Sequence, residues 1–217
     1  HYKNVSNTLR KLIHKRTKVA IIRNGINLKD SVLPYTKAHQ IIECIIDCPT
    51  QQTTINHYTQ LKSGLITLDK KASLYNFDLL FNKQHIDFTF SNDFKTESWK
   101  KLIESSALGS ILCLSGKTAK IFIDQDIINL YSKIIKEGIA VANADGANIP
   151  LNFSRYLIDK VHELPSHKSS SMLTDRLKGN PIEIDAKNGA ISSLGKKYNI
   201  DTPFNDFITH LLKHTNV

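Results

Sequence analysis

Residues 170–191 read SSMLTDRLKGNPIEIDAKNGAI, and they are the most informative stretch of this chain. Two adjacent serines are followed by Asp175, then by the triplet Glu183-Ile184-Asp185 and by the pair Asn188-Gly189. A combination of this length is far more specific than a short phosphate-binding or metal-binding motif. We expect one of the serines to cap the helix that follows, because its hydroxyl can accept a bond from a free N–H of the first turn. The remaining free N–H groups at such a helix start favour an anion.

The first part of the chain, residues 1–92, alternates between helix and strand. Val5, Leu9, Leu12 and Ile13 fall at helical spacing, with lysine and arginine on the other side. Apolar runs predict strands at Lys18–Ile22, Gln40–Ile46, Gly64–Leu68 and Ile86–Phe90. The first of these runs directly into Asn24-Gly25, a turn signal.

From about residue 93 the pattern becomes helical, so we predict a domain boundary near residue 92. Three helices are expected over Phe94–Leu114, Ile127–Ala144 and Phe153–Leu164. The second should stop at Gly146, because glycine tolerates the left-handed backbone of a helix end. A last helix begins at Thr202-Pro203, a cap followed by proline at the first position. We expect its buried residues to be Phe204, Phe207, Ile208 and Leu211.

Composition excludes several classes of protein. With 217 residues, of which 41% are hydrophobic, the chain can bury a core. It has no apolar run as long as a membrane span and no secretory signal, so we expect a cytoplasmic protein that does not bind membranes. The net charge of +9 is spread over many segments, and aromatics (8%) do not alternate with basic residues, which argues against nucleic acid. Neither the three cysteines nor the nine histidines have ligand-like spacing, so no metal is expected.

The stretch 170–191 resembles the C-terminal signature of the ketopantoate reductase (2-dehydropantoate 2-reductase) family. Further matching pieces occur in the right order: Ile22-Arg23-Asn24-Gly25, Trp99-Lys100-Lys101-Leu102, Glu137 with Val141–Gly146, and Thr202-Pro203-Phe204-Asn205. The resemblance is weak over residues 26–92 and strong over residues 165–206.

This resemblance implies an α/β plus all-α fold. Residues 1–92 would be the C-terminal half of a Rossmann-type NADP-binding domain, and residues 93–217 a helical 6-phosphogluconate-dehydrogenase-like domain that binds substrate. The first half of the Rossmann-type domain, with its glycine-rich turn, is absent from these residues. Because the chain starts at His1 and its only methionine is Met172, we expect a truncated or processed product.

The resemblance also implies roles for individual residues. Lys101, in the Trp-x-Lys motif, would protonate the substrate oxygen as a hydride reaches the neighbouring carbon. Asn24 would contact both the cofactor and the substrate, Ser171 would bind the substrate carboxylate, and Glu183 would contact the cofactor, NADPH. Two structural alternatives stay open. In the first, the serines serve only as caps. In the second, Asn180, Pro181 and Glu183 form a capping box.

One wall of the implied pocket departs from the family pattern. Where well-characterised members carry asparagines one and two turns after the lysine, this chain has Ser105 and Gly109. At spacings of four, Lys101, Ser105 and Gly109 share one helical stripe. The family amides help to hold the hydroxyl of ketopantoate, so we expect a smaller and less polar wall.

The function implied by the resemblance is NADPH-dependent reduction of ketopantoate to pantoate, in pantothenate biosynthesis. One alternative is a reductase of another small 2-oxo acid, and another is a non-catalytic remnant. A small 2-oxo acid is the expected partner, with a homodimer as the candidate assembly.

Overall fold

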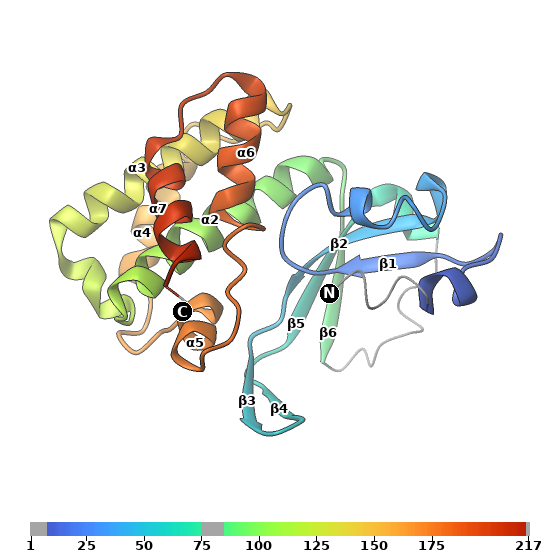
Figure 1. Ribbon diagram of the computed structural model, residues 1–217, viewed down its shortest axis with the longest axis horizontal. Coiled ribbons are helices and arrows are strands. Elements are labelled where there is room, and N and C mark those ends of the chain that lie inside the picture. Colours follow the sequence, from blue (N-terminus) through green and yellow to red (C-terminus); the bar gives the residue numbers. More distant parts are fainter. Residues whose placement is uncertain (1–7, 75–84, 216–217) are drawn as a thin grey trace. The chain divides into compact units, whose positions relative to one another are not determined.

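The computed structural model describes residues 8–74 and 85–215 (Figure 1). The chain divides into two compact units, His1–Glu97 and Ser98–Val217, and each is described by itself. Within the described residues, no helix is both long enough and apolar enough to cross a membrane.

The first unit contains a four-stranded sheet in the order β1-β2-β5-β6, formed by β1 (Val19–Ile22), β2 (Ile41–Asp47), β5 (Gly64–Asp69) and β6 (Ile86–Ser91). β1 is parallel to β2 and β5 to β6, whereas β2 and β5 are antiparallel. All four predicted strands are therefore present. Their apolar side chains form the core of the unit, in which Ile66 and Leu68 are almost completely buried. Short 3-10 helices accompany the sheet at Leu28–Ser31, Ala38–Gln40 and Lys70–Leu74.

The helix expected at the start of the chain is described over residues 8–12, and Val5 lies outside the described residues. Leu12 is 66% exposed, so this helix does not bury the whole predicted apolar stripe.

A small hairpin, β3 (Thr50–Thr54) with β4 (His57–Gln60), was not predicted from the sequence. It lies beyond one end of the four-stranded sheet in Figure 1. Every residue of β4 is exposed, so the strand carries none of the apolar alternation that signals a half-buried strand. At the turn, Asn56 adopts a left-handed backbone with φ of 63°, which asparagine tolerates better than most residues.

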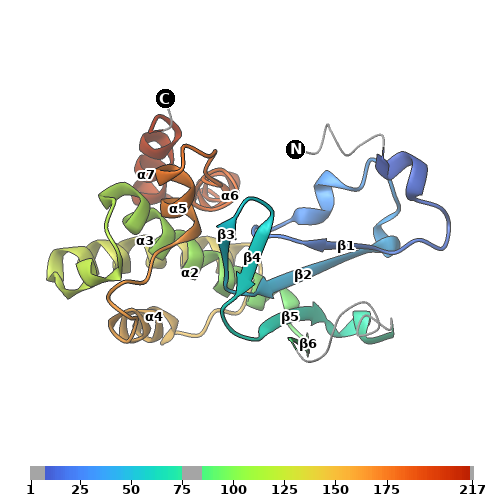
Figure 2. The same cartoon turned by 90° about the horizontal axis from the view of Figure 1, so that it is seen from below.

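The second unit is helical, as predicted (Figures 1 and 2). Its helices are α2 (Phe94–Ser115), α3 (Gln125–Ala144), α4 (Phe153–His162), α5 (Ser171–Leu177), α6 (Asn188–Tyr198) and α7 (Pro203–Lys213), with a 3-10 helix at Ala119–Ile123. Asp124 caps α3 by accepting from the N–H groups of Asp126 and Ile127. Gly146 follows the end of α3 with φ of 87°, the left-handed backbone expected there.

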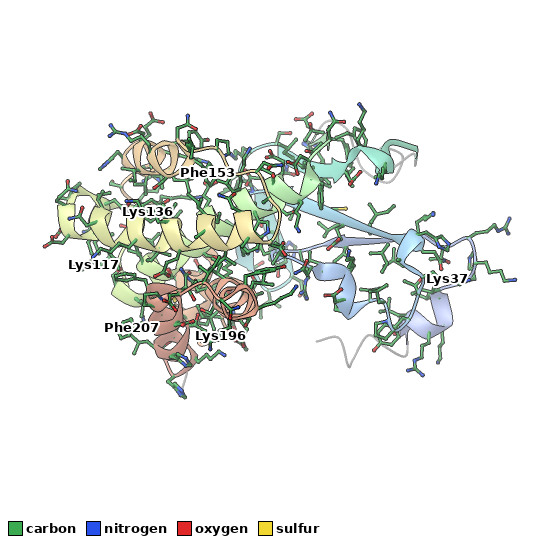
Figure 3. All side chains as sticks on the ribbon, turned by 90° about the horizontal axis from the view of Figure 1, so that it is seen from above. Lys37, Lys117, Lys136, Phe153, Lys196 and Phe207 are labelled. Carbon is green, nitrogen blue, oxygen red and sulfur yellow. The ribbon has the colours of Figure 1, made fainter. Side chains whose placement is uncertain are left out.

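The prediction for α7 is partly wrong. Ile208 is buried as expected, but Phe207 is 64% exposed and Leu211 45% exposed. Phe207 lies on the outer side of α7 in Figure 3. The buried face consists of Asn205, Ile208, Thr209 and Leu212. The difference arises because a polar residue, Asn205, takes a fully buried position in a hydrogen-bond network.

Candidate active site

Trp99 fixes the start of the helix that carries Lys101. Its indole is fully buried, and Nε1 donates a hydrogen bond of 3.0 Å to Asp145 Oδ2 at the end of α3. The hydroxyl of Tyr198, from α6, donates to the other oxygen of Asp145. The Asp145 carboxylate at the end of α3 is thus hydrogen-bonded to both α2 and α6, and these bonds fix the orientation of α2 about its axis. Lys100 and Lys101 are both half-buried.

Lys101, Ser105 and Gly109 share one face of α2, as predicted, and Gly109 lies next to α5. Ser105 is half-buried, and its hydroxyl donates to the carbonyl of Leu102 within the same helix, at 3.3 Å. Gly109 is buried one turn further on. A Cβ atom placed there would lie 3.2 Å from Met172 Sδ and 3.7 Å from Lys187 Nζ. The absence of a side chain at this position therefore makes room for two others.

Ser170 and Ser171 make different contacts. Ser170 caps α5, because its Oγ accepts from the backbone N–H of Leu173 at 3.2 Å. This confirms that one serine is a cap. Ser171 is the first residue of α5, and its Oγ lies 3.5 Å from Lys187 Nζ, which donates to it. This contact is not a helix cap, and the expected binding of the substrate carboxylate by Ser171 stays a prediction.

The capping-box alternative for Glu183 is wrong, because no helix begins at Asn180. Residues 180–183 have no regular secondary structure, and α6 starts only at Asn188. The chain instead makes a turn around the buried Ile184, whose carbonyl accepts from the N–H groups of Lys187 and Gly189 at 3.2 and 2.9 Å. Glu183 is exposed on the segment that precedes this turn.

Lys187 was not singled out from the sequence, but it lies beside two of the predicted site residues, Gly109 and Ser171. It is only 3% exposed, directly before α6. Burial lowers the pKa of Lys187, and the nearby Lys101 lowers it further, whereas Glu183, Asp175 and Cys113 act in the opposite direction. Lysine side chains are almost never fully buried, so composition gives no reason to suspect one. The available signal was its position inside the most specific motif of the chain.

Several other motif residues serve to hold the helices together. Glu137, on α3, accepts from the backbone N–H groups of Phe204 and Asn205, both at 2.9 Å. The Asn205 side chain donates to the same carboxylate at 2.7 Å, and its oxygen accepts from Asn188 Nδ2 at 2.9 Å. This carboxylate, and not the Thr202 hydroxyl, satisfies the start of α7, which corrects the expected cap.

Asn24 belongs to the first unit. It follows β1 and is half-buried, and Gly25 after it has φ of 119°, a backbone that requires glycine. A pocket in this unit, lined by residues that include His39, Glu43 and Asp69, contains none of the predicted site residues. No cluster of three or more potential metal ligands occurs in residues 8–74 and 85–215.

The structure thus brings together Lys101, Gly109, Ser171, Glu183 and Lys187 within the helical unit. Gly109 and Ser171 both lie beside the Lys187 ammonium, and Lys101 and Glu183 both affect its pKa. Ser105 shares the α2 stripe with Lys101 and Gly109. The fold is an α/β unit followed by a helical unit, and the candidate site on the helical unit includes two lysines, a serine and a carboxylate.

Comparisons with known proteins agree with this fold. A dimeric ketopantoate reductase from Staphylococcus aureus superposes with a TM-score of 0.88 at 22% identity, over 99% of this chain and 73% of that one. The structure of D-mandelate dehydrogenase with NADH and anilino(oxo)acetate gives a TM-score of 0.89 at 20% identity, over 99% and 72%. These likenesses support the α/β-plus-helical fold.

Sequence comparison gives the family. Residues 93–216 match the model described as "Ketopantoate reductase PanE/ApbA C terminal". The 2-dehydropantoate 2-reductase of Caulobacter vibrioides is 28% identical over 201 residues, which is 93% of this chain and 69% of the relative. The enzyme of the same name from Mycobacterium tuberculosis is 27% identical over 205 residues, or 94% and 69%. The chain belongs to the ketopantoate reductase family.

Proposed function

We propose that this protein reduces a small 2-oxo acid with a nicotinamide cofactor, and that its main reaction is the NADPH-dependent reduction of 2-dehydropantoate (ketopantoate) to pantoate. One observation supports the proposal most directly. Gly109, on the same face of α2 as Lys101, lies beside Lys187, and Lys187 is hydrogen-bonded to Ser171. This arrangement gives one site two amines and a hydroxyl, which suits an acid with adjacent oxo and carboxylate groups. The names of the relatives support the same reaction.

The residues present fit a nicotinamide cofactor by their chemistry. Glu183 offers an exposed carboxylate, which accepts hydrogen bonds from hydroxyl or carboxamide groups. Asn24 offers an amide that both donates and accepts. We propose that these two residues hold the cofactor, which when bound supplies a hydride to the 2-oxo carbon of the substrate.

Lys101 is the proposed proton donor. As the 2-oxo carbon gains a hydride, its oxygen develops the charge of an alkoxide. An ammonium beside that oxygen stabilises the charge and then transfers a proton from Nζ to it, which completes the 2-hydroxy acid. Ser171 is proposed to hold the carboxylate, so that the acid is bound in one orientation. By analogy with the dimeric S. aureus enzyme, a homodimer is the proposed assembly.

The function is tested by following NADPH oxidation by the intact protein with ketopantoate. Steady turnover is the expected result. If neither ketopantoate nor any other small 2-oxo acid is reduced, the proposal is wrong and a non-catalytic role is favoured.

The second prediction concerns the choice of acid. Ser105 and Gly109 replace two amides by a hydroxyl, already bonded to Leu102, and by a hydrogen atom. Each neutral hydrogen bond lost costs roughly 0.5–1.5 kcal/mol, so two losses shift the preference by about tenfold or more. We therefore expect poor discrimination between ketopantoate and 2-oxoisovalerate, which lacks the hydroxyl. A preference for ketopantoate on the order of a thousandfold in kcat/KM, beyond what two such bonds can remove, would contradict this.

The third prediction separates the roles of Glu183 and Ser171. Glu183→Gln is expected to weaken NADPH binding in isothermal titration while leaving the melting temperature nearly unchanged, because Glu183 is exposed and caps no helix. Ser171→Ala is expected to raise KM for the oxo acid. Glu163→Gln, at the exposed end of α4, is the matched control and should alter neither quantity. Unchanged NADPH affinity in Glu183→Gln would remove this residue from the cofactor site.

A further inference from the structure

The Lys187 ammonium is buried with too few partners. An ammonium has three N–H donors. In the part of the chain that the structure describes, its hydrogen-bond partner is Ser171 Oγ, at the long distance of 3.5 Å, and it forms no ion pair with a carboxylate. A buried cation is costly unless it is paired and hydrogen-bonded. A lysine held in this state is therefore poorly explained by the stability of the fold.

The surroundings of the ammonium point toward the substrate. Its Nζ lies 3.7 Å from the place where a Cβ of residue 109 would be, so it borders the α2 stripe that carries Lys101. It also lies beside the hydroxyl of Ser171. Lys101 is one of the charges that lower the pKa of Lys187. Lys187 thus contacts the residue to which the acid-binding role is assigned, and it borders the helix face that carries the proposed proton donor.

We infer that Lys187 is a substrate-binding residue, whose ammonium, together with the Ser171 hydroxyl, holds the carboxylate of the 2-oxo acid. The inference rests on the proposed function. In a 2-oxo acid the carboxylate is bonded directly to the oxo carbon. Two neighbouring amines, those of Lys101 and Lys187, can therefore bind the oxo oxygen and the carboxylate at the same time. Lys101 faces the oxo oxygen and Lys187 the carboxylate. Because the Lys187 ammonium pairs with the carboxylate, it makes no hydrogen bond to the distal hydroxyl of ketopantoate.

A purely structural role gives the opposite result in one experiment, the replacement Lys187→Met. Methionine has a similar length and is apolar, and replacing a poorly paired buried charge in this way is often neutral or stabilising. If Lys187 serves the substrate, the variant should keep or raise its melting temperature and lose affinity for the acid. If Lys187 serves the fold, the variant should melt earlier and keep its KM.

The experiment uses the intact protein, Lys187→Met and the control Lys196→Met, which removes an exposed lysine from the last turn of α6 (Figure 3). KM is measured with ketopantoate, 2-oxoisovalerate and the neutral amide of 2-oxoisovalerate. Lys187→Met is expected to raise KM for both acids by about 10-fold to 100-fold, the scale of one hydrogen bond to a charged group. It should leave KM for the amide almost unchanged, and Lys196→Met should match the wild type throughout.

Binding of oxamate, a 2-oxo carboxylate that is not reduced, is measured in parallel by isothermal titration in the presence of NADPH. Oxamate should bind to the wild type and to Lys196→Met, and much more weakly to Lys187→Met. An unchanged KM and oxamate affinity in Lys187→Met would overturn the inference, as would a loss confined to ketopantoate, which would assign Lys187 to the hydroxyl. If the wild type reduces no 2-oxo acid, the proposed function fails. Oxamate binding that depends on Lys187 would still support the anion site.

Discussion

The replacement Lys101→Ala is expected to lower kcat by about 100-fold or more, the usual scale for removing a positioned acid. The amine is held on α2 by the buried Trp99, whose indole is bonded to Asp145. Alanine favours helix and leaves this anchor intact, so the variant should fold normally. The measurement is steady-state reduction of the 2-oxo acid, with a thermal melt to verify folding.

Lys100→Ala is the matched control, because it removes the same charge from the neighbouring position of the same helix. It points about 100° away around α2 and should leave kcat nearly unchanged. Equal effects of the two replacements would show that the proton donor is misassigned.

The second large effect is expected on stability. Glu137→Ala removes the acceptor of three N–H groups, those of Phe204, the Asn205 backbone and the Asn205 side chain. A buried donor left without a partner costs about 1–3 kcal/mol. Because Asn205 is fully buried, the free energy of unfolding should fall by about 3 kcal/mol or more.

This loss is measured by urea denaturation. Glu163→Ala, at the exposed end of α4, should change the free energy of unfolding by less than about 0.5 kcal/mol. A decrease below about 1 kcal/mol in Glu137→Ala, within the range of ordinary substitutions, would mean that water replaces the carboxylate at the start of α7.

Much of the fold could be predicted because its signals are local. The strands β1, β2, β5 and β6 are short apolar runs, and a glycine with positive φ, Gly146, follows the end of α3. The hairpin of β3 and β4 was missed because its residues are polar and its pairing depends on a turn at Asn56. The buried face of α7 was partly wrong because the partner of Asn205, Glu137, is distant in the sequence.

In the candidate site, too, residues marked by local motifs could be predicted, and a residue buried by distant parts of the chain could not. Lys101 and Ser171 could be singled out because short motifs mark them, and Ser170 because a serine before a helix is a common cap. Lys187 could not, since its burial results from α2, α5 and α6 coming together around it. For the same reason, the sequence predicted a less polar wall at Ser105 and Gly109 and did not reveal that the Lys187 ammonium lies beside Gly109.

The missing side chain at position 109 also constrains how this site can evolve. The first atom of a larger residue there would come 3.2 Å from Met172 Sδ and 3.7 Å from Lys187 Nζ, so an amide at 109 and a lysine at 187 compete for one volume. A mutation at either position changes the cost of a mutation at the other, and their effects on fitness are not additive. We therefore expect a replacement of Gly109 by an amide to require a shift of Met172, and to be tolerated better when Lys187 is replaced by a shorter residue.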